Sequence, residues 1–327
     1  ERPLVIVGKG MAWSRAEDEV REFIERTQLP FLASPMGKGV MPDEDPLSVG
    51  AARSLALKEA DVVLLMGARL NWIMHFGLPP RFNKDVKVIQ LDINPEEIGR
   101  NVPAEVALVG DGRAVTSQLN RALDDRQWFY PADTPWRTAL KEKADANAAQ
   151  VQPMIDSDTA PSNYYRAFKD IREWLTDDAI IIGEGANTMD IGRTQMPNAK
   201  PRHRLDAGTY GTMGVGLGFA VAAAVTNPDK PVVSVQGDSA FGFSGMEIET
   251  MVRYNLPVKL IVLNNGGIGG GIGPLKKGQT VPPGILTYGA RYDGMMEALG
   301  GKGIFVEDPK DLRAALDEAM AFDGPAL

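Results

Sequence analysis

The sequence predicts an α/β protein made of two doubly wound domains, each built on a parallel sheet. Short runs of Val, Ile and Leu alternate with amphipathic segments along both halves of the chain. The runs are continuously apolar, which is typical of parallel strands that helices cover on both faces. The length of 327 residues suits about two domains. We place the first domain at residues 1–123, a connector at 124–161 and the second domain at 162–327.

The first half contains five candidate strands. They lie at residues 3–7, 30–33, 62–66 and 86–91, with a weaker one at 106–109. Between the first two lies a predicted helix, residues 16–27, in which Val20, Phe23 and Ile24 recur on one face. The polar, proline-marked connector is expected to hold a helix at 136–150 but no strand.

The second half repeats the alternation of helices and strands. We expect helices at 162–175, 214–225, 245–254, 292–299 and 309–321, and strands at 179–183, 232–236, 258–263 and 303–306. A Gly/Pro-rich loop is expected at 266–284. The result is a second α/β domain of the same class.

Composition excludes several classes of protein. A net charge of −8 with a pI near 5.0 argues against a nucleic-acid-binding surface. Cysteine is absent, which excludes disulfides and thiolate chemistry, and two histidines do not suit a His-rich metal site. No apolar run approaches about 18 residues, and the N-terminus lacks a signal-peptide pattern. We therefore expect a cytoplasmic protein with no membrane or nucleic-acid partner.

Both ends of the sequence suggest a piece of a longer chain. It opens at Glu1 and enters a strand almost at once, and it stops where an apolar strand is expected to begin. We interpret the C-terminus as truncated.

The strongest chemical pattern is Gly237-Asp238-Ser239 followed by Asn264-Asn265. Each group follows a predicted strand, and the segment between them is long enough for one helix and one strand. Open α/β sheets bind ligands at the carboxyl ends of their strands. A carboxylate, an amide oxygen and a nearby backbone carbonyl form a hard-oxygen site suited to Mg²⁺ bridged to phosphates, which the N–H groups after Asp238 would face. Taken singly, either dipeptide is ordinary turn chemistry.

Two further segments accompany this pattern. The glycine-rich run at 208–214 precedes a predicted helix, where Met213 could simply fill a core. The segment 184–190 follows another strand, and its Asn187 and Thr188 are placed to meet phosphate groups, with Tyr164 beside them. The alternative for Asn187 and Thr188 is a helix cap.

The GDS and NN groups resemble the signature of thiamine-diphosphate enzymes. This resemblance implies that Asp238, Asn265 and the Gly267 carbonyl bind Mg²⁺. The residues implied to contact thiamine diphosphate are Gly237, Ser239, Ala240 and Ile268, together with Tyr164, Asn187, Thr188 and the loop residues Gly211, Thr212 and Met213. In that family a bulky side chain props the two rings into a V, and a carbonyl two residues earlier accepts the 4′-amino group. Those roles fall here to Met213 and Gly211.

The wider match is to 2-hydroxyacyl-CoA lyases and the related oxalyl-CoA decarboxylases. It rests on GEGANTMDIGRT, PRHRLDAGTYGTMGVGLGFA and GDSAFGFSGMEIETMVRYNLPV in the second domain. GKGM at 8–11, SPMGKGV at 34–40 and GARLNWIMHFGLPPR at 67–81 agree in the first. The run GRTQMPNAKPRHRLDAGTYGTMG is similar to the lyase branch, which favours cleavage of a 2-hydroxyacyl-CoA to formyl-CoA and an aldehyde or ketone. One departure is Gly269, where the family usually has an aromatic residue, and it indicates either a wider pocket or a shortened loop.

The resemblance also implies partners. The family's activating glutamate belongs to an N-terminal domain of a neighbouring subunit, so we expect a homotetramer, as a dimer of dimers, that is catalytic only with that missing domain. No residue of this chain is assigned the role. Glu184, Glu247 and Glu249 lie in the same domain, but none is expected to be a buried carboxylate beside the cofactor.

Two ligand sites are less specific. Arg193, Arg202 and Arg204 are candidates for the phosphates of coenzyme A, although arginine more commonly serves solubility. In oxalyl-CoA decarboxylases the first domain binds ADP, which carries over to Lys9, Arg69, Asp92 and Ile93. A Gly-x-Gly turn alone is weak support for a nucleotide site, and the alternative is a domain that only scaffolds the tetramer.

Three functions therefore remain open at this point. They are a 2-hydroxyacyl-CoA lyase, an oxalyl-CoA decarboxylase, and a non-catalytic nucleotide-binding or assembly module.

Overall fold

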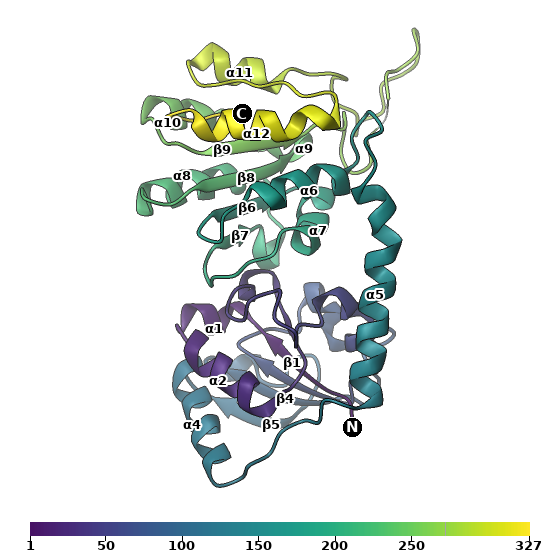
Figure 1. The fold of residues 1–327 in the computed structure, drawn as a ribbon, viewed down its shortest axis with the longest axis vertical. Coiled ribbons are helices and arrows are strands. Elements are labelled where there is room, and N and C mark those ends of the chain that lie inside the picture. The colour runs from purple at the N-terminus through teal and green to yellow at the C-terminus, as the bar shows by residue number, and fades with distance from the viewer. Residues whose placement is uncertain (272) are drawn as a thin grey trace. The chain divides into compact units, whose positions relative to one another are not determined.

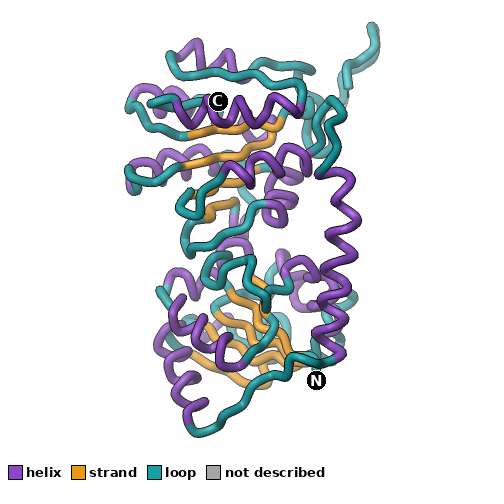
Figure 2. The backbone as a smooth tube through the Cα atoms, in the orientation of Figure 1, coloured by secondary structure: helices purple, strands orange, loops and turns teal. Residues whose placement is uncertain are grey.

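The computed structural model describes residues 1–271 and 273–327, so one residue of the predicted loop 266–284 lies outside the described residues. The chain forms two compact units. The first contains Glu1–Gln152 and Pro197–Arg202, and the second contains Pro153–Met196 and His203–Leu327. Strands lie inside each unit and helices lie outside (Figure 2). The predicted fold class, two parallel α/β domains, is confirmed.

The first unit is built on a five-stranded parallel sheet in the order β2-β1-β3-β4-β5. Its strands are β1 (Pro3–Val7), β2 (Phe31–Ala33), β3 (Val62–Met66), β4 (Lys87–Asp92) and β5 (Ala104–Val109). The chain steps first to one side of β1 and then to the other, so the strand order reverses between β1 and β3. All five predicted strands are present.

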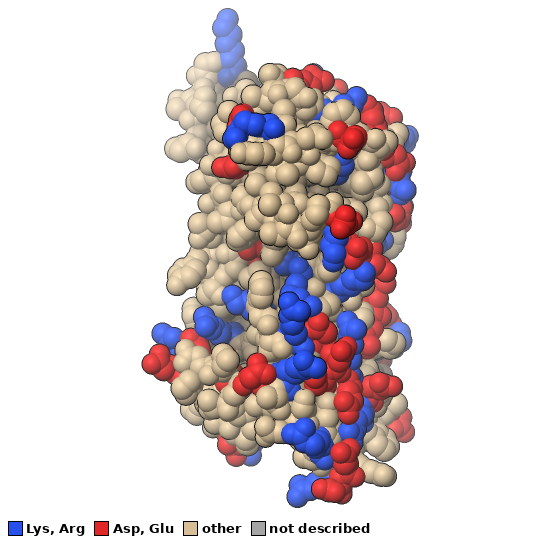
Figure 3. Space-filling view, turned by 90° about the vertical axis from the view of Figure 1, so that its left-hand side faces the viewer, with Lys and Arg blue, Asp and Glu red and all other residues tan. Residues whose placement is uncertain are grey.

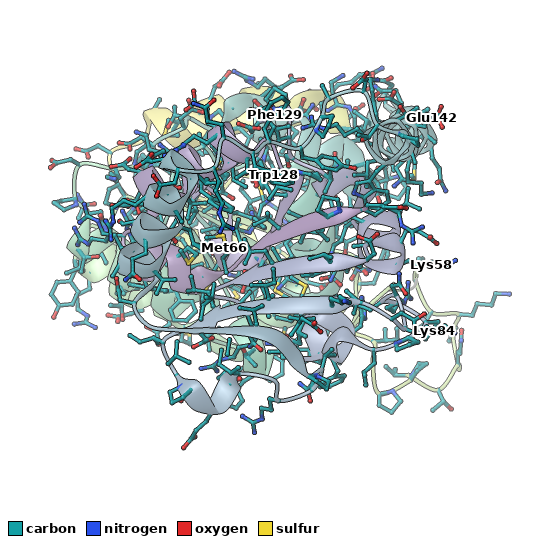
Figure 4. The ribbon with its side chains drawn as sticks, turned by 90° about the horizontal axis from the view of Figure 1, so that it is seen from below. Lys58, Met66, Lys84, Trp128, Phe129 and Glu142 are labelled. Carbon is teal, nitrogen blue, oxygen red and sulfur yellow. The ribbon has the colours of Figure 1, made fainter. Side chains whose placement is uncertain are left out.

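Helices cover both faces of this sheet (Figure 1). They are α1 (Lys9–Trp13), α2 (Glu17–Thr27), α3 (Arg53–Glu59), α4 (Gly112–Asp124) and α5 (Pro135–Ile155), with short 3-10 turns η1 (Pro35–Gly37), η2 (Gly50–Ala52), η3 (Trp72–Gly77) and η4 (Pro95–Glu97). In α2 the predicted apolar face is buried, and three acidic residues occupy the first turn, where they favour the helix dipole. Met66 lies among the strands, whereas Lys58, Lys84 and Glu142 lie at the margin in water (Figure 4).

The predicted connector is not a separate segment in the structure. Trp136 donates its indole N–H to the Pro3 carbonyl at 2.9 Å, and the side chains of Tyr130, Trp136 and Leu140 are buried in the first core. The first unit therefore extends to Gln152, beyond the predicted boundary at residue 123. Trp128 and Phe129, ahead of α5, keep 52% and 62% of their area exposed (Figure 4).

Three glycines allow close backbone packing at the reversal point of the first sheet. A Cβ on Gly8 would lie 2.1 Å from the Gly67 carbonyl oxygen, and one on Gly10 would lie 2.8 Å from it. Gly67 itself has a φ of +58°, in the left-handed region that favours glycine. The turn after β1 can therefore reach the end of β3 only because these side chains are absent.

The second unit holds a four-stranded parallel sheet in the order β7-β6-β8-β9. Its strands are β6 (Ile180–Glu184), β7 (Arg204–Asp206), β8 (Val232–Gly237) and β9 (Lys259–Leu263). Its helices are α6 (Tyr164–Trp174), α7 (Ala186–Gln195), α8 (Gly216–Thr226), α9 (Asp238–Ser244), α10 (Glu247–Arg253), α11 (Tyr292–Leu299) and α12 (Leu312–Ala321), with 3-10 turns η5 (Gly208–Tyr210) and η6 (Pro309–Asp311).

Successive residues of β6 pack in two different hydrophobic cores. Ile180 and Ile182 pack with α8, α10 and α11, whereas Ile181 packs with α6, α7 and α12. This is the two-sided burial that the continuously apolar strands predict.

One predicted strand of the second unit is wrong. Residues 303–306 are not a strand, because their neighbour in the sheet is the short segment 325–327. The Ile304 N–H donates to the Leu327 carbonyl and the Leu260 N–H donates to the Ala326 carbonyl, both at 2.8 Å. This segment forms only isolated bridges, at Lys259 and Lys302, which are too few for a regular ladder. Strand β7 and helices α7 and α9 were not predicted.

Two surface properties of the described residues bear on function. No helix formed by residues 1–271 and 273–327 combines the length and apolarity needed to cross a membrane. On the face in Figure 3, Lys and Arg are intermixed with Asp and Glu, so this face does not present a broad basic patch.

Candidate functional site

Three strand ends of the second unit meet at one edge of its sheet. Glu184 of β6 pairs with Gln236 of β8, and Gly237 of β8 pairs with Leu263 of β9. The residues that follow these strands therefore lie side by side, as the sequence predicts for Asp238 and Asn265. The strand order reverses between β6 and β8, and such a reversal is where open α/β sheets bind ligands.

Asp238 is the buried centre of this edge. Asp238 is the first residue of α9 and is only 2% exposed. Its Oδ1 accepts the Ser239 N–H at 2.7 Å, and its Oδ2 accepts the N–H groups of Gly266 and Gly267 at 2.7 and 3.1 Å. Burial raises the pKa of Asp238, and these backbone donors oppose that rise because they favour the charged form.

Asn265 and Tyr164 are joined beside Asp238. Asn265 Nδ2 donates to the Tyr164 hydroxyl at 2.9 Å and to the Gly269 carbonyl at 2.7 Å, and its Oδ1 accepts the Gly267 N–H at 3.2 Å. Tyr164 begins α6, and both burial and the neighbouring Asp238 carboxylate raise the pKa of its hydroxyl. The Gly269 carbonyl, which can only accept, and the Gly267 N–H, which can only donate, set the orientation of the amide: its Nδ2 faces Gly269 and the Tyr164 hydroxyl, and its oxygen faces the turn at 266–267.

Asn187 and Thr188 reach the same place from α7. Asn187 Nδ2 donates to the Gly269 carbonyl at 3.1 Å, and both side chains hydrogen-bond the Tyr164 hydroxyl. Gly185, with a φ of +107°, precedes them, and a Cβ there would lie 3.2 Å from the Gly237 nitrogen. The missing side chain lets the turn after β6 approach the turn after β8. Neither Asn187 nor Thr188 provides the N-cap of α7, which falls on Gly185.

Residues 208–214, here called the ring loop, lie between β7 and α8. Its Gly211 has a φ of +62° and its Gly214 a φ of +88°, so both positions favour glycine. Thr212 is exposed and Met213 is partly buried, whereas Tyr210 is 94% exposed. Met213 therefore is not a fully buried core residue.

Sequence reasoning missed a buried carboxylate beside this loop. Glu184 is 0% exposed, contrary to our expectation that none of Glu184, Glu247 and Glu249 is a buried carboxylate beside the cofactor. It accepts the N–H groups of Gly214 and of Gly216, the latter at 2.8 Å. A glutamate that ends a Val/Ile-rich strand just before a glycine was the available signal. By contrast, Glu249 is paired with Arg253 at 2.9 Å and Glu247 is exposed.

The remaining cofactor candidates, Ser239, Ala240 and Ile268, differ in burial. Ser239 is partly buried and Ala240 fully buried, and they continue α9 after Asp238. Ile268 is 65% exposed, and its N–H donates to the Gly284 carbonyl at 2.8 Å.

The three arginines proposed for coenzyme A have partners within their own units. Arg193 donates to Asp206 at 3.1 Å and to Asp190 at 3.0 Å, and Arg202 donates to Glu17 at 2.8 Å. Arg204 is 2% exposed within β7, a position that does not suit contact with the phosphate of a bound ligand. We therefore no longer assign Arg204 to that role.

The four residues proposed for ADP follow strand ends of the first unit. Lys9 and Ile93 are exposed, Asp92 accepts the Asn94 N–H at 2.9 Å, and Arg69 lies 3.6 Å from Glu97. Their positions follow β1, β3 and β4, near the reversal of strand order. ADP binding remains a prediction.

The donor set of the second unit suits a hard cation held together with a diphosphate. Asp238 Oδ1 and Asn265 Oδ1 each accept one N–H group, and an oxygen of either kind can accept more than one partner. Among the described residues no three His, Asp or Glu side chains gather into a metal-binding group. A cation here would thus depend on amide, carbonyl and phosphate oxygens besides one carboxylate, which is the pattern that Mg²⁺ favours.

Comparison with known proteins agrees with this site. Residues 1–119 match the family described as "Thiamine pyrophosphate enzyme, central domain", and residues 185–327 match "Thiamine pyrophosphate enzyme, C-terminal TPP binding domain". In fold, the chain is similar to a solved Mycobacterium smegmatis protein described as thiamin diphosphate-dependent. That likeness has a TM-score of 0.76 at 23% identity, over 99% of this chain and 60% of the other.

The chain therefore belongs to the thiamine-diphosphate enzymes, of which it carries the central domain and the C-terminal cofactor-binding domain. Within that class it is similar to 2-hydroxyacyl-CoA lyases and oxalyl-CoA decarboxylases. It is 51% identical to 2-hydroxyacyl-CoA lyase 1 of Mus musculus, over 98% of this chain and 57% of that protein. It is 45% identical to oxalyl-CoA decarboxylase of Escherichia coli, over 100% of this chain and 58% of that protein. The chain thus spans little more than half the length of these relatives.

Proposed function

We propose that this chain is the cofactor-binding part of a carbon–carbon lyase that cleaves a 2-hydroxyacyl-CoA to formyl-CoA and an aldehyde or ketone. The observation that carries the proposal is the group formed by Asp238, Asn265 and Tyr164 at the reversal point of the second sheet. The 51% identity to a 2-hydroxyacyl-CoA lyase favours the lyase over other reactions of the class.

In this proposal Mg²⁺ is held by Asp238 Oδ1, Asn265 Oδ1 and the Gly267 carbonyl. Asp238 would contribute the protein's negative charge to a cation that would neutralise the diphosphate. Asn187, Thr188 and Tyr164 lie beside these ligands and add neutral hydrogen-bonding groups. The diphosphate end is therefore anchored by residues from α6, α7, α9 and the turn after β9.

The ring loop serves the other end of the cofactor. The chemistry supplied there by thiamine diphosphate, when bound, would be an electron sink for carbon–carbon cleavage. The Gly211 carbonyl would accept a hydrogen bond from the amino group of the pyrimidine ring, and the Met213 side chain would support the rings. Because catalytic rate depends on reactant geometry within about 1 Å, the shape of this loop matters as much as its composition.

We further propose that the carboxylate that activates the pyrimidine ring lies outside residues 1–327, on a second copy of the protein in a homo-oligomer. Within the described residues Glu184 is committed to the backbone of the ring loop, and Glu249 is paired with Arg253. Oligomers commonly complete such sites between subunits.

The second candidate function is decarboxylation of oxalyl-CoA, which the 45% identity to the Escherichia coli enzyme favours. Both candidates would use the same cofactor site, so the products distinguish them.

The complete protein, loaded with thiamine diphosphate and Mg²⁺, is offered a 2-hydroxyacyl-CoA and, separately, oxalyl-CoA. The lyase proposal predicts an aldehyde or ketone with formyl-CoA from the first; CO₂ release from the second alone would contradict it. Robust cleavage by residues 1–327 in isolation would contradict the placing of the activating carboxylate.

A further inference from the structure

The buried carboxylate of Glu184 is bonded to the backbone that follows the ring loop. Its two oxygens accept the N–H groups of Gly214 and Gly216, and Val215 adds a third N–H. The N–H groups of Val215 and Gly216 stand at the start of α8, where the helix itself provides no acceptor, and Gly214 directly precedes them. Val215, the N-cap residue, has no side-chain oxygen to satisfy them. A residue of β6 thus takes the place of a local helix cap.

The packing around Glu184 leaves little freedom in this contact. A Cβ on Gly216 would lie 2.5 Å from Glu184 Oε2 and 2.4 Å from Gln236 Nε2. The start of α8 can reach the carboxylate only because residue 216 has no side chain. Displacement of the carboxylate must therefore move the loop end with it.

A second buried carboxylate holds the opposite end of the ring loop. Asp206 ends β7 with a fully buried side chain, and its Oδ1 accepts the Gly208 N–H at 2.9 Å. Its Oδ2 accepts two bonds from Arg193, at 3.1 and 3.3 Å. The loop is thus fixed at both ends from neighbouring strands, while its middle residues Tyr210 and Thr212 are exposed.

Glu184 also adjoins the diphosphate end of the site. The next residue is Gly185, whose backbone approaches Gly237, and Asn187 and Thr188 follow in α7. The end of β6 therefore positions both parts of the site. It is joined directly to α7, which carries Asn187 and Thr188, and it holds the ring loop through the hydrogen bonds of Glu184.

We propose that Glu184 is a positioning residue that holds the Gly211 carbonyl and the Met213 side chain at a defined place relative to Asp238. This inference rests on the proposed function. It assigns Glu184 no contact with the cofactor. Its effect passes through the N–H groups of residues 214–216 and is therefore confined to the ring end.

The test compares two ligands that share the diphosphate end. Affinities for thiamine diphosphate and for inorganic pyrophosphate, each with Mg²⁺, are measured by calorimetry on the wild type and on Glu184→Gln. Glutamine keeps the size of the side chain but replaces one acceptor oxygen by an NH₂ donor. We expect Glu184→Gln to bind thiamine diphosphate at least about tenfold more weakly than the wild type, as when other residues that position ligand-binding groups are replaced. Its affinity for pyrophosphate should be unchanged. Glu247→Gln, at an exposed position, should change neither affinity, and Asp238→Ala should weaken both.

Gly216→Ala provides a second route to the same contact, since it leaves the charge in place and forces the loop end away from it. If Glu184→Gln does not fold, Gly216→Ala replaces it in the experiment. The same selective loss of affinity for thiamine diphosphate is expected. Equal losses for both ligands, or no loss for either, would overturn the positioning role while leaving the proposed function intact. A wild-type protein that binds neither ligand would overturn the proposed function and this inference together.

Discussion

Asn265 shows how neighbouring groups give one amide its role. Its oxygen accepts the Gly267 N–H at 3.2 Å, and its Nδ2 donates to the Gly269 carbonyl at 2.7 Å and to the Tyr164 hydroxyl at 2.9 Å. The sequence predicts that Tyr164 lies near the site, but not this bond, which depends on the packing of α6 beside the end of β9. The same holds for Glu184, whose burial follows from the return of the chain to it 30 residues later.

Tyr164→Phe should weaken Mg²⁺ binding in the presence of thiamine diphosphate by about tenfold, the lower range for groups that orient metal ligands. The fold should persist, because phenylalanine keeps the packing of the ring. A magnesium titration followed by calorimetry measures the change. Tyr165→Phe, the adjacent tyrosine, is the matched control and should bind as the wild type does.

Met213→Ala should separate turnover from cofactor affinity. The diphosphate anchors at Asp238 and Asn265 remain, so affinity should stay within about tenfold, whereas loss of the ring support should lower kcat by about a hundredfold. Steady-state kinetics and calorimetry on the complete protein provide the two values. A variant with wild-type turnover would show that Met213 has only a packing role.

At the scale of elements, the carboxyl ends of strands account for most of what the sequence could predict. Asp238 and Asn265 each follow a continuously apolar strand, and parallel topology then requires the two to be neighbours. The 303–306 strand failed because its pairing depends on the segment 325–327 and not on its own residues. Strand β7 was missed because it has only three residues, two of them charged.

Close glycine packing at the ends of β1 and β3 predicts a large effect on stability. Gly8→Ala places a Cβ 2.1 Å from the Gly67 carbonyl, and the backbone must shift to accept it. We expect a loss of about 1–3 kcal/mol or more in the free energy of unfolding, as for other overpacked positions. Urea unfolding measures it. Gly218→Ala in α8, where nothing lies within 4 Å, is the control and should be neutral or stabilising by up to about 1 kcal/mol.

The contact of Glu184, at the end of β6, with the start of α8 should make the stability of the protein depend on pH. Burial raises the pKa of Glu184, although the N–H groups of the loop oppose the rise. A carboxyl whose pKa is raised by folding stabilises the protein fully below its unfolded pKa, and this contribution is lost as pH rises through the folded pKa. The free energy of unfolding of the wild type, less that of Glu184→Gln, should therefore fall as pH rises from the ordinary carboxyl range towards neutrality. A difference that rises with pH would show that the pKa is lowered instead.

At the scale of the whole molecule, the two units have the same architecture but different chemistry. In both units, glycines stand at the ends of the two strands between which the strand order reverses. They are Gly8 and Gly67 in the first unit, and Gly185 and Gly237 in the second. The second unit places the buried carboxylate of Asp238 beside the amides of Asn187 and Asn265 at that edge. Fold class alone therefore predicts where a ligand could bind in each unit, and the residues that follow the strands decide which ligand it is.

The central claim is that Asp238 binds thiamine diphosphate through Mg²⁺. The most direct test is calorimetry of thiamine diphosphate binding to the wild type and to Asp238→Ala, with and without Mg²⁺. The account predicts that wild-type binding requires Mg²⁺ and that the variant binds more than about a hundredfold more weakly, because the site loses its one anionic ligand. Equal affinity of the two proteins in Mg²⁺, or wild-type binding that persists after the metal is chelated, would contradict it.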